Sequence, residues 1–199
     1  MAFLLSSTRH AGDLELQGRS VSLRPPQMAD YNAWAELRAQ SRTELEPYEP
    51  SWTRDELSRT AYRHRLKHYG REVAQDLGYS FFIFDAQGEK LFGAITLSNV
   101  RRGVAQAASV GYWIGTPATG KGHMTEALRL LAPATFRSLQ LHRLEAGCVP
   151  ANVASVRVLE KSGFKREGLA RSYLRINGNW QDHLLFARLN DDPHPEGTS

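Results

Sequence analysis

The chain has 199 residues, a length that suits one well-buried domain rather than two. Hydrophobic residues make up 41% and charged residues 23%, as in an ordinary soluble globular protein, and the single cysteine excludes a disulfide framework and a cysteine-based metal site. The net charge of +4 suits a polyphosphate ligand or loose association with RNA, and it proves neither.

The start of the chain gives no sign of a targeting segment. No apolar run approaches the roughly 18 residues that span a bilayer. Phe3, Leu4 and Leu5 are too few for the core of a signal peptide and follow no basic residue. We therefore expect a cytoplasmic protein without membrane contact, in which residues 1–18 carry no firm structural signal and are partly mobile.

A strand, a helix and a loop are predicted next. Residues 21–24 alternate between apolar and polar and stop at two prolines, which is the pattern of a short strand. Apolar residues recur through residues 31–39 and predict a helix that starts near Asp30. Residues 45–52 form a loop, because two prolines bar regular pairing. This loop combines two carboxylates with two aromatic rings, which is more than a plain linker requires.

The pattern Thr53-x-x-Glu56 is that of a capping box, and it predicts a helix through about Gly70. His64 and His68 stand four residues apart, but no third ligand completes a metal set, so we interpret them as surface residues. Two interpretations of the basic side chains stay open, an RNA or cofactor-phosphate patch and an ordinary solvated face, of which the second is favoured; these side chains are Arg54, Arg59, Arg63, Arg65 and Lys67.

Three sequential strands are expected in the middle of the chain. Residues 79–84 and 91–97 are rich in aromatic and branched residues and flank a tight connection, which predicts a hairpin. Residues 98–106 turn the chain into a third strand at residues 108–114. The three strands form an antiparallel meander.

A glycine-rich loop at residues 115–122 joins the third strand to an amphipathic helix that begins near Met124. The first N–H groups of a helix lack partners, and its dipole adds about half a positive charge there, so this junction is suited to an anion. Glycine allows close approach, because a Cβ would hold a phosphate away from the amides.

This loop has two alternative interpretations. The letters Gly115-x-x-x-x-Gly120-Lys121 match the start of a P-loop, but Gly122 replaces the Ser or Thr that ligates magnesium, and too little chain follows for the remaining βαβ units. An ordinary connector with turn glycines is the other alternative.

The last third alternates helices and strands. The helix after the glycine loop runs towards Gln140, and Pro133 should kink it or end its first segment. Residues 144–149 form a strand parallel to the third one, by a right-handed crossover. Asn152 caps a helix through Lys161 that Gly163 closes.

A hairpin and a tail end the chain. Asn177-Gly178 lies between residues 173–176 and 180–189, which is a type I′ hairpin signal. Residues 1–190 are thus expected to form one domain, followed by a disordered tail at residues 191–199. Cys148 is interpreted as a small buried hydrophobe.

The order of elements resembles the GNAT superfamily of N-acetyltransferases over residues 21–189. Several runs are similar to the branch that acetylates the N-terminal residue of ribosomal proteins (RimJ/RimL), and Leu97 to Gly103 is most similar to the RimJ side. These runs are Gly111-Tyr112-Trp113-Ile114-Gly115, Gly120-Lys121-Gly122-His123-Met124-Thr125-Glu126-Ala127, Leu141-His142-Arg143-Leu144-Glu145-Ala146, Pro150-x-Asn152-x-x-Ser155-x-Arg157-Val158-Leu159-Glu160-Lys161-x-Gly163-Phe164, Glu167-Gly168 and Ile176-Asn177-Gly178-x-Trp180-x-Asp182-His183.

The resemblance implies an α+β fold, a mixed and mostly antiparallel sheet with a splayed parallel pair at its centre and flanking helices. It implies acetyl-CoA as co-substrate and no metal. The pantetheine arm is expected along the third strand, the pyrophosphate on the glycine loop, and Asn152 at the acetyl end. The implied cofactor-binding residues are Tyr112, Trp113, Ile114, Gly115, Gly120, Lys121, Gly122, His123, Met124, Thr125, Asn152 and Ser155.

The catalytic roles concern a proton donor for the thiolate and a base for the amine. Ser155 is expected to protonate the departing thiolate, and simple helix capping is the alternative for Ser155 and Asn152. Relatives on the RimL side have a proposed glutamate base at the position of Leu174, and leucine cannot take that role. The identity of the base therefore stays open. Glu49 is the candidate, and the alternative is that Glu49 is an ordinary solvated loop carboxylate. Residues expected to line the peptide slot are Tyr48, Trp52, Asn99, Tyr112 and Tyr173, some of which are alternatively core.

The predicted reaction is direct attack of a protein N-terminal amine, an alanine of a ribosomal protein, on the thioester. The amine has a pKa of about 7.7–8, so a tenth to a fifth is neutral at about pH 7 and a strong base is optional. Alternatives are the same chemistry on an aminoglycoside or polyamine, and an acyl-CoA-binding or RNA-associated module without turnover. Association with the ribosome or RNA stays open, and no direct binding to DNA is expected.

Overall fold

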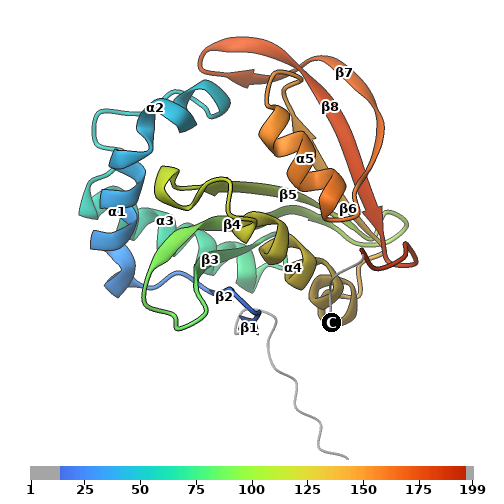
Figure 1. Ribbon diagram of the computed structural model, residues 1–199, viewed down its shortest axis with the longest axis horizontal. Coiled ribbons are helices and arrows are strands. Elements are labelled where there is room, and N and C mark those ends of the chain that lie inside the picture. The colour runs from blue at the N-terminus through green and yellow to red at the C-terminus, as the bar shows by residue number, and fades with distance from the viewer. Residues whose placement is uncertain (1–13, 196–199) are drawn as a thin grey trace, which may run out of the picture.

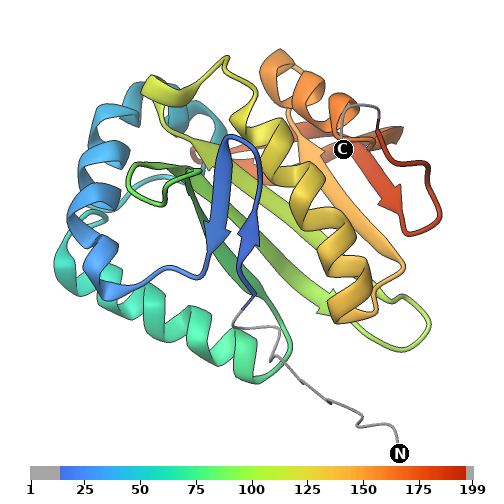
Figure 2. The same cartoon turned by 60° about the horizontal axis from the view of Figure 1, so that its bottom comes forward.

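The computed structural model describes residues 14–195. One mixed sheet runs through the molecule, and helices cover both of its faces (Figures 1 and 2). The strands are β1 (Leu16–Gln17), β2 (Val21–Arg24), β3 (Tyr79–Asp85), β4 (Leu91–Arg101), β5 (Ala107–Ile114), β6 (Arg143–Cys148), β7 (Lys165–Ile176) and β8 (Asn179–Leu189). The helices are α1 (Tyr31–Gln40), α2 (Arg42–Leu45), α3 (Arg59–Ala74), α4 (His123–Leu139) and α5 (Val153–Lys161), with short 3₁₀ turns at Met28–Asp30, Glu46–Tyr48 and Thr116–Ala118.

The strand order is β1-β2-β3-β4-β5-β6-β8-β7. Every neighbouring pair is antiparallel except β5 and β6, which are parallel because α4 carries the chain back between them. The predicted meander of β3, β4 and β5 and the predicted parallel pair are therefore confirmed, and so is the α+β fold class.

The two faces of β3 explain why the sheet is covered on both sides. Its side chains alternate, with Phe81 and Ile83 in a core cluster that includes α4, and Phe82 and Phe84 in a second cluster with Trp34 of α1 and Tyr62 of α3. These four side chains of β3 are all buried. Helices α1 and α3 thus cover one face, and α4 covers the other.

The start of α3 differs from the prediction. Thr53 and Glu56 form no capping box: the hydroxyl of Thr53 donates to Asp55, and Glu56 accepts from Arg65. The helix begins instead after Ser58, whose hydroxyl accepts from the N–H of Ala61 at 3.1 Å. The Glu56 carboxylate forms an ion pair with Arg65 of α3 instead of capping the helix at Thr53.

Other local predictions have mixed outcomes. Pro133 lies inside α4, which runs unbroken from His123 to Leu139, so the expected end of a first segment is wrong. The predicted loop at residues 45–52 contains the end of α2 and a 3₁₀ turn. The Asn177-Gly178 hairpin is confirmed, since both residues have positive φ.

The two ends of the chain are only partly described. The expectations for residues 1–13 and 196–199 lie outside the described residues, while β1 at Leu16–Gln17 pairs with β2, which was not predicted. In the expected tail, Asp192 accepts from the N–H of Leu189 and pairs with Lys165. Among residues 14–195 no helix is long and apolar enough to cross a membrane.

Candidate active site

A gap opens where β5 and β6 separate. The two strands pair at only three positions, from Ala107 with Arg143 to Ser109 with Glu145. Beyond these positions β6 continues along β8 as far as Cys148, and β5 continues along β4 as far as Ile114. On the side away from β4, the backbone edge of β5 beside Tyr112 therefore faces the gap and has no strand paired to it. This is the splayed parallel pair that the sequence led us to expect.

A cavity of about 180 Å³ lies in this gap. Its walls come from β5, from β6, from the start of α5, from the loop after α2 and from β8. The lining residues are Tyr48, Val110, Gly111, Tyr112, Ala146, Gly147, Cys148, Val149, Asn152, Ser155, Leu159 and His183. No Asp, Glu, Lys or Arg is among them, so the cavity is polar but carries no fixed charge.

Tyr112 and Ser155 meet across the cavity. The Tyr112 hydroxyl lies 2.8 Å from Oγ of Ser155, and the Ser155 N–H donates to Oδ1 of Asn152 at 3.0 Å. Burial raises the pKa of Tyr112 well above its ordinary value, although the hydrogen bond with Ser155 opposes the shift. The phenol is therefore protonated at neutral pH, and the pair can pass a proton to a group in the cavity.

Asn152 has a confirmed structural role, because its side chain caps α5. Only Oδ1 is used in the cap. The side-chain amide N–H groups of Asn152 donate to no acceptor recorded within residues 14–195, so they are free to donate to a ligand in the cavity. Capping and ligand binding are thus compatible.

Cys148 also lines the cavity, a position that its sequence context did not reveal. Its side chain is buried, as predicted. Burial raises the pKa of the thiol, and a hydrogen bond with Ser155 opposes that shift. The thiol is therefore mostly protonated at neutral pH.

The glycine loop reaches α4 through two left-handed residues. Gly120 has φ of 72° and Gly122, the N-cap of α4, has φ of 83°. A Cβ at either position would meet nothing within 4 Å, so both glycines face open space. Within residues 14–195 no acceptor is recorded for the N–H groups of Gly120, Gly122, His123 and Met124, which makes the helix start a set of free donors.

Several side chains around this loop are already engaged. The Lys121 ammonium donates to Pro117 O at 2.8 Å. The His123 ring stacks on Phe92 with centroids 4.3 Å apart, and Met124 is buried in the core. Thr125 accepts from Ser162 through its carbonyl. The backbone N–H groups of this segment therefore stay available to a ligand, as does Lys121 after release.

Three other predicted cofactor residues have packing roles. The Arg38 guanidinium lies over the Trp113 ring at 5.0 Å, so the indole belongs to the α1 side of the sheet. A Cβ on Gly115 would lie 2.3 Å from Leu37 of α1, which explains the glycine by close packing. Ile114 packs against the main core cluster. Their contribution to a ligand is limited to the backbone.

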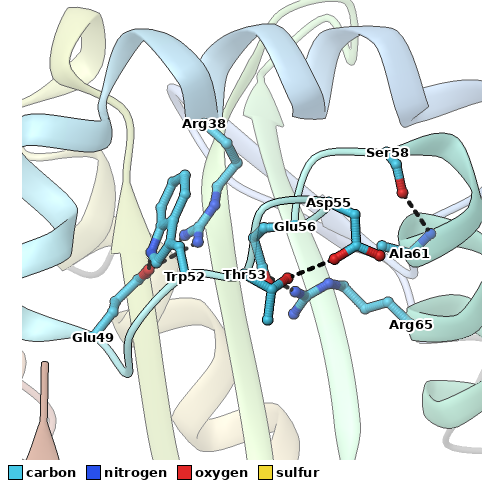
Figure 3. A network of polar contacts seen from close by, with 9 residues as sticks. All are labelled: Arg38, Glu49, Trp52, Thr53, Asp55, Glu56, Ser58, Ala61 and Arg65. Carbon is cyan, nitrogen blue, oxygen red and sulfur yellow. Dashed lines mark hydrogen bonds and ion pairs between the residues drawn. The ribbon is translucent and has the colours of Figure 1, made fainter. Parts of the chain in front are cut away.

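Glu49, the residue after the cavity-lining Tyr48, is part of a polar network (Figure 3). Both of its carboxylate oxygens accept from Arg38, and Oε2 also accepts from the indole N–H of Trp52 at 2.8 Å. Three N–H donors thus hold this carboxylate in place. The predicted role of Glu49 as base stays a prediction, and this geometry favours a structural role.

The same loop is tied to the turn between β7 and β8. The Asn177 N–H donates to the carbonyl of Glu49 at 2.9 Å, which links segments far apart in the chain. Tyr48, two-fifths exposed, extends from this loop into the cavity lining. Tyr48 of the loop and His183 of the hairpin both line the cavity, and we call the side of the cavity next to these two segments its mouth.

The remaining predicted substrate residues differ in position. The Tyr173 ring is half-exposed and meets the His183 ring edge-on, with centroids 5.8 Å apart. Asn99, which has φ of 51°, lies in an irregularity between β4 and β5 and does not line the cavity. Leu174 pairs with Gln181 and is partly exposed, so no carboxylate is supplied at that position.

The sequence gives His183 no role beyond its place in the run from Ile176 to His183, yet the fold buries its side chain in the cavity wall. The signal that could have found it is a histidine in a hairpin strand that follows a type I′ turn. Residues 14–195 contain no group of three or more His, Cys, Asp or Glu side chains placed to hold a metal ion.

Comparison with known proteins gives a consistent result. Residues 20–165 match the family model of the acetyltransferase (GNAT) domain. The chain is 38% identical over 177 residues to a probable N-acetyltransferase, YjcK, of Bacillus subtilis, covering 89% of this chain and 98% of the relative. It is 34% identical over 168 residues to the [ribosomal protein uS5]-alanine N-acetyltransferase of Escherichia coli, covering 83% and 87%.

Solved structures agree with the sequence relatives. The structure of Mycobacterium smegmatis RimJ in complex with CoA-disulfide is similar with a TM-score of 0.83 and 33% identity, covering 92% of this chain and 88% of that one. The ribosomal-protein-S5-alanine acetyltransferase of Vibrio fischeri has a TM-score of 0.83 and 30% identity, covering 90% and 98%.

Proposed function

The chain belongs to the GNAT acetyltransferase family, and from this premise we propose that it acetylates the N-terminal α-amine of a protein, specifically an N-terminal alanine of a ribosomal protein. The enzyme is an N-acetyltransferase, and acetyl-CoA is its donor. The observation that carries the proposal is the cavity beside Tyr112 of β5. The glycine loop that follows β5 presents free backbone N–H groups at the start of α4.

The donor site is assigned from these two features. The diphosphate lies on the N–H groups at the start of α4, where the helix dipole favours an anion. The pantetheine arm lies along the unpaired edge of β5, and its amides pair with the backbone of residues 112–114. The thioester then reaches Asn152 and Ser155 in the cavity.

The acceptor site is assigned to the mouth of the cavity. The loop with Tyr48 and Glu49 and the turn at Asn177 are joined by a backbone hydrogen bond, so they present one surface to an incoming chain end. Tyr173 and Tyr48 supply exposed aromatic surface there. A peptide that begins with a small residue can place its α-amine beside the thioester.

The reaction follows from the groups in the cavity. The neutral amine attacks the thioester carbonyl, the C–N bond forms, and the C–S bond breaks as the intermediate collapses. Ser155, hydrogen-bonded to Tyr112, protonates the departing thiolate. No covalent enzyme intermediate is involved.

A direct assay tests the proposal. The protein is incubated with acetyl-CoA and either a peptide with an N-terminal alanine, the same peptide with a blocked N-terminus and an internal lysine, or a polyamine and an aminoglycoside. Thiol release and the mass gain of one acetyl group on the first peptide alone support the proposal. Turnover restricted to the small amines, or CoA binding without turnover, would overturn it.

A further inference from the structure

We propose that the imidazole of His183 accepts the proton that the attacking amine loses, through its Nε2 atom. This inference rests on the proposed N-acetyltransferase reaction at the same cavity. His183 comes from β8, only 3% of its side chain is exposed, and it lines the cavity that also contains Ser155 and Cys148. The proton donor and the proton acceptor thus lie in one enclosed space.

The hydrogen bond of the ring determines which nitrogen is free. Nδ1 of His183 lies 2.9 Å from the carbonyl oxygen of Gln181, two residues earlier on the same strand. A carbonyl oxygen only accepts, so Nδ1 carries the hydrogen and the neutral ring presents a lone pair at Nε2. Within residues 14–195 no protein group is hydrogen-bonded to Nε2.

The neighbours of the ring keep this nitrogen accessible. A Cβ on Gly147 would lie 3.8 Å from Cδ2 of His183, which is the ring atom next to Nε2. Gly147 is on β6 in the cavity lining, so this edge of the ring faces the cavity wall without a side chain in front of it. Tyr173 of β7 meets the ring edge-on and limits its rotation.

The other titratable groups that face His183 are poorer bases. Tyr48, Tyr112 and Cys148 line the same cavity, and Tyr173 contacts the ring. Phenols have an ordinary pKa of about 10 and thiols of about 8.5, and burial raises the pKa of both Tyr112 and Cys148. No carboxylate lines the cavity, so the lone pair on the His183 ring is the basic site that this lining offers.

The proton balance is then complete. The nitrogen of the neutral amine bonds to the thioester carbon and becomes positively charged. It loses one proton to Nε2 of His183, and the collapsing intermediate breaks the C–S bond. The thiolate takes a proton from Ser155, Ser155 regains one from Tyr112, and Tyr112 regains one from water. The imidazolium then returns its proton to water, so one acetamide and one free thiol result.

Replacement of the ring tests the inference. In His183→Gln we expect kcat/KM for an N-terminal alanine peptide to fall at least 100-fold, as for loss of a general base, while the Kd of acetyl-CoA is unchanged. The matched control is His142→Gln, an exposed histidine outside the cavity, which keeps full activity. In His183→Ala, added imidazole should restore turnover in proportion to its neutral form. Wild-type turnover in His183→Gln, or no rescue in a folded His183→Ala that binds acetyl-CoA, would overturn the inference.

A second measurement does not depend on the acceptor. ¹⁵N chemical shifts of histidine-labelled protein, assigned by the signal lost in His183→Gln, should show a hydrogen on Nδ1 and none on Nε2 in the neutral ring. A hydrogen on Nε2 would overturn the inference even if the enzyme acetylates alanine peptides. If those peptides are not acetylated but another amine is, the proposed acceptor fails, and His183 is tested with that amine.

Discussion

Arg38 and Glu49 form a two-point ion pair, in which Nη1 lies 2.7 Å from Oε1 and Nη2 lies 2.8 Å from Oε2. The guanidinium also lies over the rings of Trp52 and Trp113, at 4.2 and 5.0 Å from their centroids. Arg38 is almost fully buried, whereas Glu49 is about one-fifth exposed. The carboxylate therefore neutralises a buried cation and holds the loop at the cavity mouth.

The first prediction concerns this pair. Glu49→Gln leaves the Arg38 charge without a counterion, so the free energy of unfolding should fall by about 1–3 kcal/mol, less than for a fully buried pair because Glu49 is partly exposed. Urea unfolding measures this loss. The KM of the peptide should rise, while the shape of the pH profile of kcat stays the same.

The control for this prediction is the double variant Arg38→Met with Glu49→Gln, which removes both charges and should regain part of the stability. If Glu49→Gln instead folds as stably as the wild type and loses the acidic limb of its pH profile, Glu49 is the base and the structural role is wrong.

The second prediction concerns the glycine loop. Gly122→Ala places a Cβ in open space beside the free N–H groups of α4, at a φ of 83°. We expect the KM of acetyl-CoA to rise at least tenfold, because the Cβ holds the diphosphate away from the amides. Steady-state kinetics at saturating peptide measure the effect.

Gly88→Ala is the matched control for the backbone strain that an alanine causes at a positive φ. Gly88 has φ of 77° in the turn between β3 and β4, and a Cβ there also meets nothing within 4 Å. Both variants should lose about 1 kcal/mol of stability, since each forces an alanine into the left-handed region. An equal KM in both variants would show that the loop does not bind the diphosphate.

The third prediction concerns the hydroxyl pair in the cavity. Ser155→Ala removes the group that protonates the thiolate, so kcat should fall by about 10²-fold or more. Tyr112→Phe should also lower kcat, because it removes the hydrogen-bond partner of Ser155. A double-mutant cycle measures the coupling, and the double variant should be no slower than Ser155→Ala alone. Purely additive losses would mean that the two hydroxyls act separately.

The fourth prediction concerns Cys148, the only cysteine of the chain. Burial raises the pKa of its thiol, so the reactive thiolate is scarce at neutral pH and increases as the pH rises towards that pKa. Alkylation by iodoacetamide should be slow at about pH 7, accelerate through about pH 9, and stop when CoA is bound. Mass spectrometry measures the labelled fraction. Labelling that CoA does not slow would place the thioester end elsewhere.

Many elements of this fold are visible in local sequence patterns. Runs of aromatic and branched residues marked β3, β4 and β5, and the left-handed pair Asn177-Gly178 marked the last hairpin. The cap of α5 at Asn152 was equally local. These predictions succeeded because each depends on residues within a few positions of one another.

The failures involve residues far apart in the chain. The capping box at Thr53 did not form, because Glu56 pairs with Arg65, nine residues later, and the cap formed at Ser58 instead. The β7 strand contains two register shifts, so the β7 residue that lies opposite His183 could not be counted from the turn. Arg38 gave no signal either, since its partner Glu49 lies across a loop.

Local patterns and family resemblance thus sufficed for the order of the elements, the glycine loop and the class of reaction, because turns, caps and periodicity are short-range properties. Packing between distant segments selected the chemistry inside the cavity: it paired Tyr112 with Ser155, directed His183 into the wall, and engaged Glu49 with Arg38. Side chains brought together by a splayed sheet have no fixed spacing in the sequence, which is why the fold was needed to find them.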